Sequence, residues 1–154
     1  NKKVAINISA KEAESLDSLP ENFCLISINE EFSDNTKLKF LEDRVLRLKF
    51  TDICASVNHK DLTYSSINKE QVDLILDFIE KYKDFNFLVH CMASISRSSA
   101  VCLFLHLFYD YDLKERFWNL SSPNPFVLGF LILEYKKRKS GEIFENNGLV
   151  YKFL

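Results

Sequence analysis

A mostly apolar segment between residues 85 and 111 constrains the fold more than any other feature of the sequence. Its first part, FNFLVHC (85–91), is short and mostly apolar, which is typical of a strand in the middle of a parallel sheet. Its last part, RSSAVCLFLHLFYDY (97–111), is apolar nearly all round, so we expect a buried central helix. A buried strand followed closely by a buried helix predicts a layered α/β architecture.

The other segments of the chain continue this alternation. Residue patterns predict further strands over 3–8, 23–29 and 45–50, and further helices over 10–17, 68–83, 114–120 and 126–139. Residues 51–67 have no clear periodicity and are expected to form a long loop. No repeat and no linker rich in Pro or Gly divides the chain. We therefore predict a single α/β domain over residues 1–154, with a mainly parallel central sheet flanked by helices.

The overall composition narrows the classes of function. The chain has 154 residues, of which 47% are hydrophobic and 27% charged, as in globular proteins. A net charge of -2 gives no general attraction to nucleic acid or to anionic membranes. No apolar run approaches the roughly 20 residues that a membrane span needs. The polar N-terminal segment does not resemble a signal peptide, so we expect a cytoplasmic protein, and we expect a monomer.

The four cysteines show neither CxxC pairs nor the spacing of a zinc site. We therefore expect reduced thiols, no metal and no cofactor. Cys24 and Cys102 lie in apolar segments and are interpreted as core residues. Cys54 is interpreted as an unpaired loop residue, with the alternative that it forms a protective disulfide with Cys91 during oxidation.

The most specific chemical signal is the order strand, His90-Cys91, five residues, Arg97-Ser98, helix. A cysteine between a strand end and a helix N-terminus is surrounded by backbone N–H groups and the positive end of the helix dipole, which stabilise a thiolate and bind an oxyanion. Arg97 can grip two oxygens of that anion bidentately. Ser98 can hydrogen-bond the sulfur, and His90 is expected to order the loop. The phosphate-binding loop residues would be Met92, Ala93, Ser94, Ile95 and Ser96.

The stretch VHCMASISRSSAV resembles the signature loop of the cysteine-dependent protein tyrosine phosphatases. It is similar to the compact dual-specificity branch and to small bacterial tyrosine-phosphatase-like proteins. The resemblance implies that Cys91 is the nucleophile of a cysteinyl-phosphate intermediate, Arg97 the phosphate clamp and Ser98 the group that helps the thiolate leave. It also implies a phosphorylated protein substrate and a reaction without metal.

The same resemblance implies a general acid upstream of the loop. In compact members this aspartate follows a strand ending in Phe-x-Asp, and LRLKFTD resembles that pattern, which places the acid at Asp52. The separation from Cys91 is longer than usual in the family, so Asp61 is the alternative. The stretch SSPNPFVLGFLILEY resembles the Pro-Asn segment and following helix of dual-specificity phosphatases, with Asn124 as a supporting residue and Phe130 where a glutamine is common.

One position departs from the family pattern, because Ser94 stands where the family almost always has glycine. If this position needs a positive φ, serine costs about 1 kcal/mol, since a Cβ atom disfavours the left-handed conformation. Alternatively, the serine Cβ would crowd the substrate and harm turnover. Backbone N–H groups rather than glycine bind phosphate, so the loop can still form a phosphate cradle.

The function predicted from the sequence is phosphomonoester hydrolysis, on phosphotyrosine with or without phosphoserine and phosphothreonine. The first alternative is a phosphate-binding pseudophosphatase in which Ser94 or the long acid loop has abolished turnover. The second is a phosphatase of small molecules such as sugar or inositol phosphates. The uncharged interior of the loop weighs mildly against substrates with several phosphates.

Overall fold

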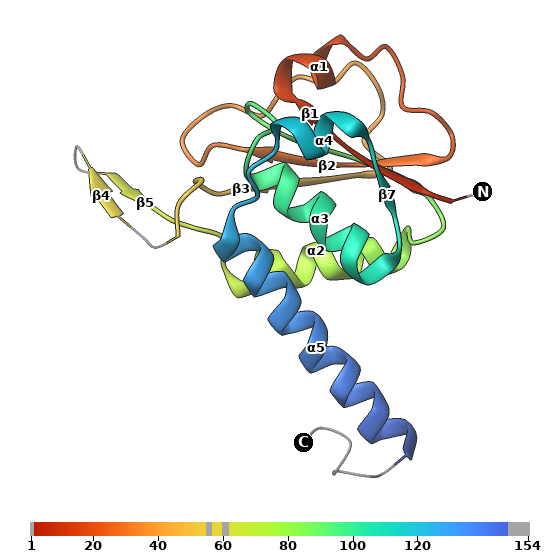
Figure 1. Cartoon of the computed structure of the whole chain (residues 1–154). Helices are drawn as coiled ribbons and strands as arrows, with labels where there is room; N and C mark the ends of the chain where they lie inside the picture. Colours follow the sequence, from red (N-terminus) through yellow and green to blue (C-terminus); the bar gives the residue numbers. More distant parts are fainter. Residues whose placement is uncertain (1, 55–56, 60–61, 148–154) are drawn as a thin grey trace.

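A central parallel sheet organises the protein, whose computed structural model describes residues 2–54, 57–59 and 62–147. Five strands pair in the order β3-β2-β6-β1-β7, and every pair is parallel (Figure 1). The strands are β1 (Val4–Ser9), β2 (Phe23–Asn29), β3 (Val45–Lys49), β6 (Asn86–Cys91) and β7 (Asp112–Leu113). The predicted parallel sheet is confirmed, and the strand that ends in Cys91 lies at its centre.

Helices cover both faces of this sheet (Figure 1). On one face lie α2 (Lys69–Lys81), α3 (Arg97–Tyr109) and α5 (Pro125–Asn147), and on the other lies the short α1 (Ala10–Ser15). The central strand shows why both faces need cover. Phe87 and Val89 belong to the larger core beneath α2, α3 and α5, whereas Leu88 belongs to the smaller core beneath α1. The remaining helix, α4 (Glu115–Leu120), follows β7.

Two helices of the larger layer, α2 and α3, show how the local sequence determines where a helix begins, how it packs and where it ends. α2 begins with a capping box, in which the backbone N–H of Gln71 donates to Asn68 Oδ1 at 2.9 Å and that of Asn68 donates to Gln71 Oε1 at 3.1 Å. α3 is buried on nearly all sides, as its composition predicts, and packs against β1, β6 and α5. It ends at Asp110, which adopts the left-handed conformation with φ of 62°.

Apart from shifts of one or two residues at the ends of elements, the structure differs from the prediction in two missed strand segments and in the length of the last helix. Residues 51–67 are not one loop, because they contain an antiparallel hairpin of β4 (Val57–His59) and β5 (Leu62–Tyr64). Strands of three residues are too short to show a period of two, and the same reason hid β7. The last helix runs to Asn147 rather than to residue 139, since its charged C-terminal half lacks an apolar stripe but still favours helix. Within the described ranges, no helix is long and apolar enough to cross a membrane.

Candidate active site

Cys91 is the last residue of β6, at the carboxyl edge of the sheet, and the loop 92–96 joins it to α3. Its side chain is buried, and its Sγ lies 3.2 Å from the Oγ of Ser98 in the first turn of α3. The structure therefore brings the predicted nucleophile and the predicted leaving-thiolate helper into hydrogen-bonding contact. The contact arises because the loop 92–96 turns the chain back, so that Ser98, the second residue of α3, lies beside the strand end.

The carbonyl groups of the loop point outward, towards the elements that surround it. The carbonyl of Met92 accepts from the backbone N–H of Ala10 at 3.1 Å, and that of Ser94 accepts from the side-chain amide of Asn7 at 2.7 Å. The next two carbonyls, of residues 95 and 96, accept from the backbone N–H groups of Ser122 at 2.9 Å and Asn124 at 3.0 Å. Because C=O and the next N–H point in opposite directions across a trans peptide, the following N–H groups face away from these partners. A loop without glycine thus has the peptide orientation that an oxyanion cradle needs.

Arg97, the first residue of α3, is buried with only 4% of its surface exposed. Its Nη1 donates to the carbonyl of Phe50 at 2.8 Å, and its Nη2 donates to Glu30 Oε1 at 2.6 Å. Its Nε is also buried and has no hydrogen-bond partner in the part of the chain that the structure describes. Since a buried donor without a partner costs free energy, this atom indicates where a bound acceptor would lie.

Glu30 is a site residue that the sequence reasoning missed. It directly follows β2, as Phe50 follows β3, so the carboxyl ends of three neighbouring parallel strands converge on the loop. This is the edge where open α/β sheets place their ligands. A carboxylate just after a predicted strand was the available signal, but Glu30 is the first residue of the charged stretch EEFSDNTK (30–37), which has the composition of a turn.

His90 is fully buried beneath the loop. Its Nδ1 lies 3.0 Å from the carbonyl of Cys91, which can only accept, so Nδ1 carries a proton. Burial lowers the pKa of His90 below its usual value, so the ring is neutral and Nε2 accepts a hydrogen bond from Ser27 Oγ at 2.6 Å. Both ring nitrogens are thereby occupied, and the ring fixes the peptide that carries the cysteine.

Asp52 lies next to the loop and is exposed to solvent. Its Oδ1 accepts hydrogen bonds from Ser96 Oγ at 2.8 Å and from Asn124 Nδ2 at 2.7 Å. Asn124 also begins α5, because its Oδ1 accepts from the backbone N–H groups of Phe126 and Val127. The structure therefore brings the predicted acid and the predicted supporting asparagine together beside the loop, whereas Asp61 lies outside the described residues.

The other cysteines differ from Cys91 in their surroundings. Burial raises the pKa values of Cys24 and Cys102, which keeps these thiols protonated and unreactive. Cys54 is exposed and free. Among the described residues, no group of His, Cys, Asp and Glu side chains is arranged to hold a metal ion.

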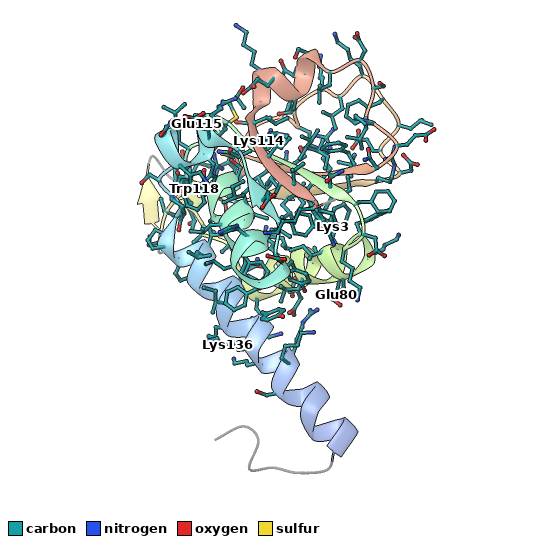
Figure 2. The ribbon with its side chains drawn as sticks, turned by 45° about the vertical axis from the view of Figure 1, so that its right-hand side comes forward. Lys3, Glu80, Lys114, Glu115, Trp118 and Lys136 are labelled. Atoms are coloured by element: carbon teal, nitrogen blue, oxygen red, sulfur yellow. The ribbon has the colours of Figure 1, made fainter. Side chains whose placement is uncertain are left out.

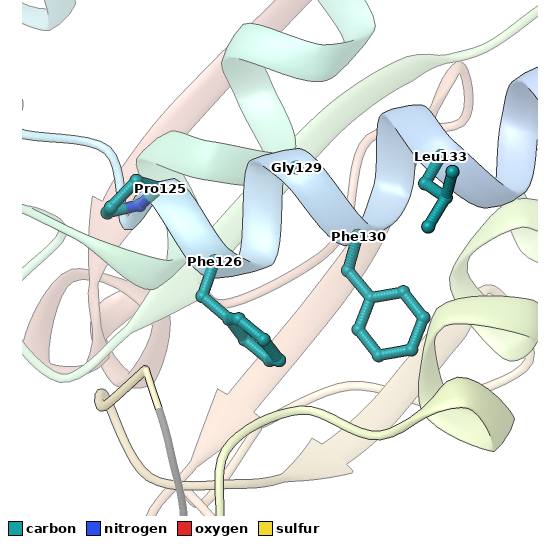
Figure 3. Close-up of a pocket in the computed structure, with 5 residues that line it drawn as sticks. All are labelled: Pro125, Phe126, Gly129, Phe130 and Leu133. Carbon is teal, nitrogen blue, oxygen red and sulfur yellow. The ribbon is translucent and has the colours of Figure 1, made fainter.

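A shallow apolar groove of about 410 Å³ runs along the first turns of α5 (Figure 3). It is lined by Pro125, Phe126, Gly129, Phe130 and Leu133. The groove begins one residue after Asn124, but none of the loop residues lines it. Phe130, where the resemblance led us to expect a glutamine, contributes an apolar ring to this groove rather than an amide.

Comparisons with known proteins support the fold. The sequence matches no protein-family model and no curated protein sequence. The structure is similar to that of human DUSP28, a dual-specificity phosphatase, with a TM-score of 0.51 and 18% identity over 90% of this chain and 94% of that chain. A single-residue variant of the same human protein gives a TM-score of 0.52 and 19% identity over 92% and 97% of the two chains. The chain therefore has the fold of the dual-specificity phosphatases, as its signature loop led us to expect.

Proposed function

We propose that this protein hydrolyses phosphomonoesters through a cysteinyl-phosphate intermediate and acts on phosphotyrosine in proteins, with or without phosphoserine and phosphothreonine. The observation that carries this proposal is the buried guanidinium of Arg97, whose Nε lacks a partner among the described residues while both Nη atoms are anchored. A phosphate oxygen bound by the loop that follows Cys91 would accept a hydrogen bond from Nε. The fold shared with dual-specificity phosphatases supports the same conclusion.

The residues supply each step of such a reaction. The thiolate of Cys91 attacks phosphorus, an S–P bond forms, and the bond from phosphorus to the substrate oxygen breaks. Asp52 protonates that oxygen, so the alcohol or phenol leaves neutral. Water then attacks the phosphoenzyme while Asp52 accepts its proton, and the S–P bond breaks to release inorganic phosphate. Ser98 donates its hydroxyl hydrogen to the departing thiolate across the 3.2 Å contact.

The rim of the loop favours a protein substrate. Met92 and Ile95 are both about half exposed, so large apolar side chains flank the opening. They suit the side chains that surround a phosphorylated residue, and the loop interior carries no added cation for a polyphosphate. These features favour phosphoproteins over small polyphosphorylated molecules.

The test is hydrolysis of an aryl phosphate and of phosphotyrosine, phosphoserine and phosphothreonine peptides, in reducing buffer with a chelator. We expect the wild-type protein to turn over, Cys91→Ser to be inactive and the matched exposed-cysteine variant Cys54→Ser to be unchanged. Activity that survives in Cys91→Ser would exclude the thiolate mechanism. A folded wild-type protein that binds orthovanadate without turnover would instead be a pseudophosphatase.

A further inference from the structure

We propose that the Ser94 hydroxyl, Arg116 and Glu12 form a clamp that holds the phosphate loop in its left-handed turn, so that Arg116 is a positioning residue for the oxyanion site. The purpose of this clamp rests on the proposed phosphatase function. Its existence rests on contacts that are independent of that function. The three residues come from the loop, α4 and α1, which are far apart in the sequence.

The backbone of Ser94 is the strained point of the loop. Its φ is 62°, and within the described ranges only Asp110, at the end of α3, is another non-glycine residue with positive φ. A residue with a Cβ atom pays about 1 kcal/mol for this conformation. The serine is also buried, so its hydroxyl must find a hydrogen-bond partner within the protein.

Two sets of contacts hold Ser94, and they differ in what they require of the side chain. Its carbonyl accepts from Asn7 Nδ2 at 2.7 Å and from Ser99 Oγ at 3.3 Å, and glycine would keep both of these bonds. Its Oγ accepts from Arg116 Nη2 at 3.0 Å, and this bond exists only because the residue is serine. The contact with Arg116 therefore offsets the cost that serine introduces.

Arg116 is itself held in a fixed orientation by Glu12. Nη1 donates to Oε2 at 2.8 Å and Nη2 donates to Oε1 at 2.9 Å, a bidentate pair. The pair lowers the pKa of Glu12 to about 2, so the carboxylate stays charged at neutral pH. Because Glu12 neutralises the guanidinium, Arg116 is not simply an additional cation for the substrate.

Glu12 completes the connection between the loop and the N-terminus of α1. Its Oε1 also accepts from the backbone N–H of Ser9, as part of the capping box of α1. The next backbone N–H, that of Ala10, donates to the carbonyl of Met92 at 3.1 Å. α1 therefore fixes the loop at residue 92 directly and at residue 94 through Arg116, which orients the peptides between them before any ligand binds.

A double-mutant cycle tests this clamp. Arg116→Ala is made in the wild-type protein and in Ser94→Gly, and Lys114→Ala, at the exposed residue that precedes α4, serves as the control (Figure 2). Two readouts are measured, the affinity for orthovanadate and the rate of amide hydrogen exchange in residues 92–97. In the wild-type background we expect Arg116→Ala to weaken vanadate binding and to speed loop exchange by about 3- to 10-fold. In Ser94→Gly we expect less than about a 2-fold effect, because glycine needs no compensation.

Equal effects of Arg116→Ala in the two backgrounds would overturn the clamp and make the pair with Glu12 a general structural contact. If Arg116→Ala does not fold, Glu12→Gln replaces it, since it keeps the side-chain volume and removes the charge that orients the guanidinium. Hydrogen exchange is measured without turnover, so the experiment can reject the clamp and the proposed enzyme activity independently of each other. A wild-type protein without turnover or vanadate binding would contradict the proposed function. The rates of amide hydrogen exchange in residues 92–97 would still show whether the clamp holds the loop.

Discussion

The side-chain amide of Asn124 donates to Asp52 Oδ1 at 2.7 Å, and so connects the start of α5 to the residue that we propose as the general acid. The same asparagine accepts from the N–H groups of Phe126 and Val127 and donates its own backbone N–H to the carbonyl of Ser96. One residue thus links the acid, the phosphate loop and the helix cap.

Substitution of Asn124 should separate these roles. Asn124→Ala removes the cap and the bond to Asp52, so we expect a loss of about 1 kcal/mol in stability together with a fall in kcat. Asn124→Ser keeps a capping oxygen but is too short to reach Asp52, so kcat should fall with most of the stability retained. Urea unfolding and steady-state kinetics measure the two effects. Normal kcat in a stable Asn124→Ser would contradict a role in positioning the acid.

Glu30 should govern the affinity for phosphate through Arg97. Its carboxylate accepts from Arg97 Nη2 at 2.6 Å, and Glu30→Ala would free the guanidinium to leave its orientation. A hydrogen bond to a charged group contributes about 1.5–3 kcal/mol, so we expect orthovanadate affinity to fall by about 10-fold or more. Titration calorimetry measures this, with Asp34→Ala, an exposed carboxylate nearby in the chain, as the control. Unchanged affinity in Glu30→Ala would show that Phe50 alone holds Arg97.

His90 should make stability depend on pH. Burial lowers its folded-state pKa below 6.5, so the unfolded chain binds a proton that the folded protein does not. The stability from the neutral ring is complete above pH 6.5 and is lost as pH falls towards the folded-state pKa. Between these two pKa values, the free energy of unfolding should fall by up to about 1.4 kcal/mol for each unit by which the pH is lowered. Urea unfolding between pH 7.5 and 5.5 should show this slope in the wild-type protein and a smaller one in His90→Asn; equal slopes would contradict it.

The two candidate acids can be distinguished directly. We expect Asp52→Asn to reduce kcat by about 10²- to 10⁴-fold, the range for a general acid, and Asp61→Asn to have little effect. Asp52 is favoured because it is held beside the loop by Ser96 and Asn124. Substrates with a better leaving group should partly restore Asp52→Asn, since such a group needs less protonation. The reverse pattern, with Asp61→Asn the impaired variant, would assign the role of general acid to Asp61 instead.

The sequence predicts best where burial is continuous. The strand over 85–91 and the helix from 97 are mostly apolar and buried, so their types, their order and hence the positions of Cys91 and Arg97 follow from local patterns. The hairpin of β4 and β5 was missed because three-residue strands in a polar segment carry no such pattern.

Contacts between side chains that are distant in the sequence could not be predicted either. Glu30 is 67 residues from Arg97, and Glu12 is 104 residues from Arg116, so neither pair leaves a signal in a local window. Ser94 was recognised as a departure from the glycine of related loops. Its compensation by Arg116 became visible only when the fold placed α4 against the loop.

The most direct test of the central claim is to trap the intermediate. Wild-type protein is mixed with an aryl phosphate, quenched in acid within the first turnover and digested, and the peptides are analysed by mass spectrometry. We expect one phosphoryl group on the peptide that contains Cys91, and none on this peptide in Cys91→Ser. Turnover by the wild-type protein with no phosphoryl group on Cys91 at any quench time would contradict the cysteinyl-phosphate mechanism.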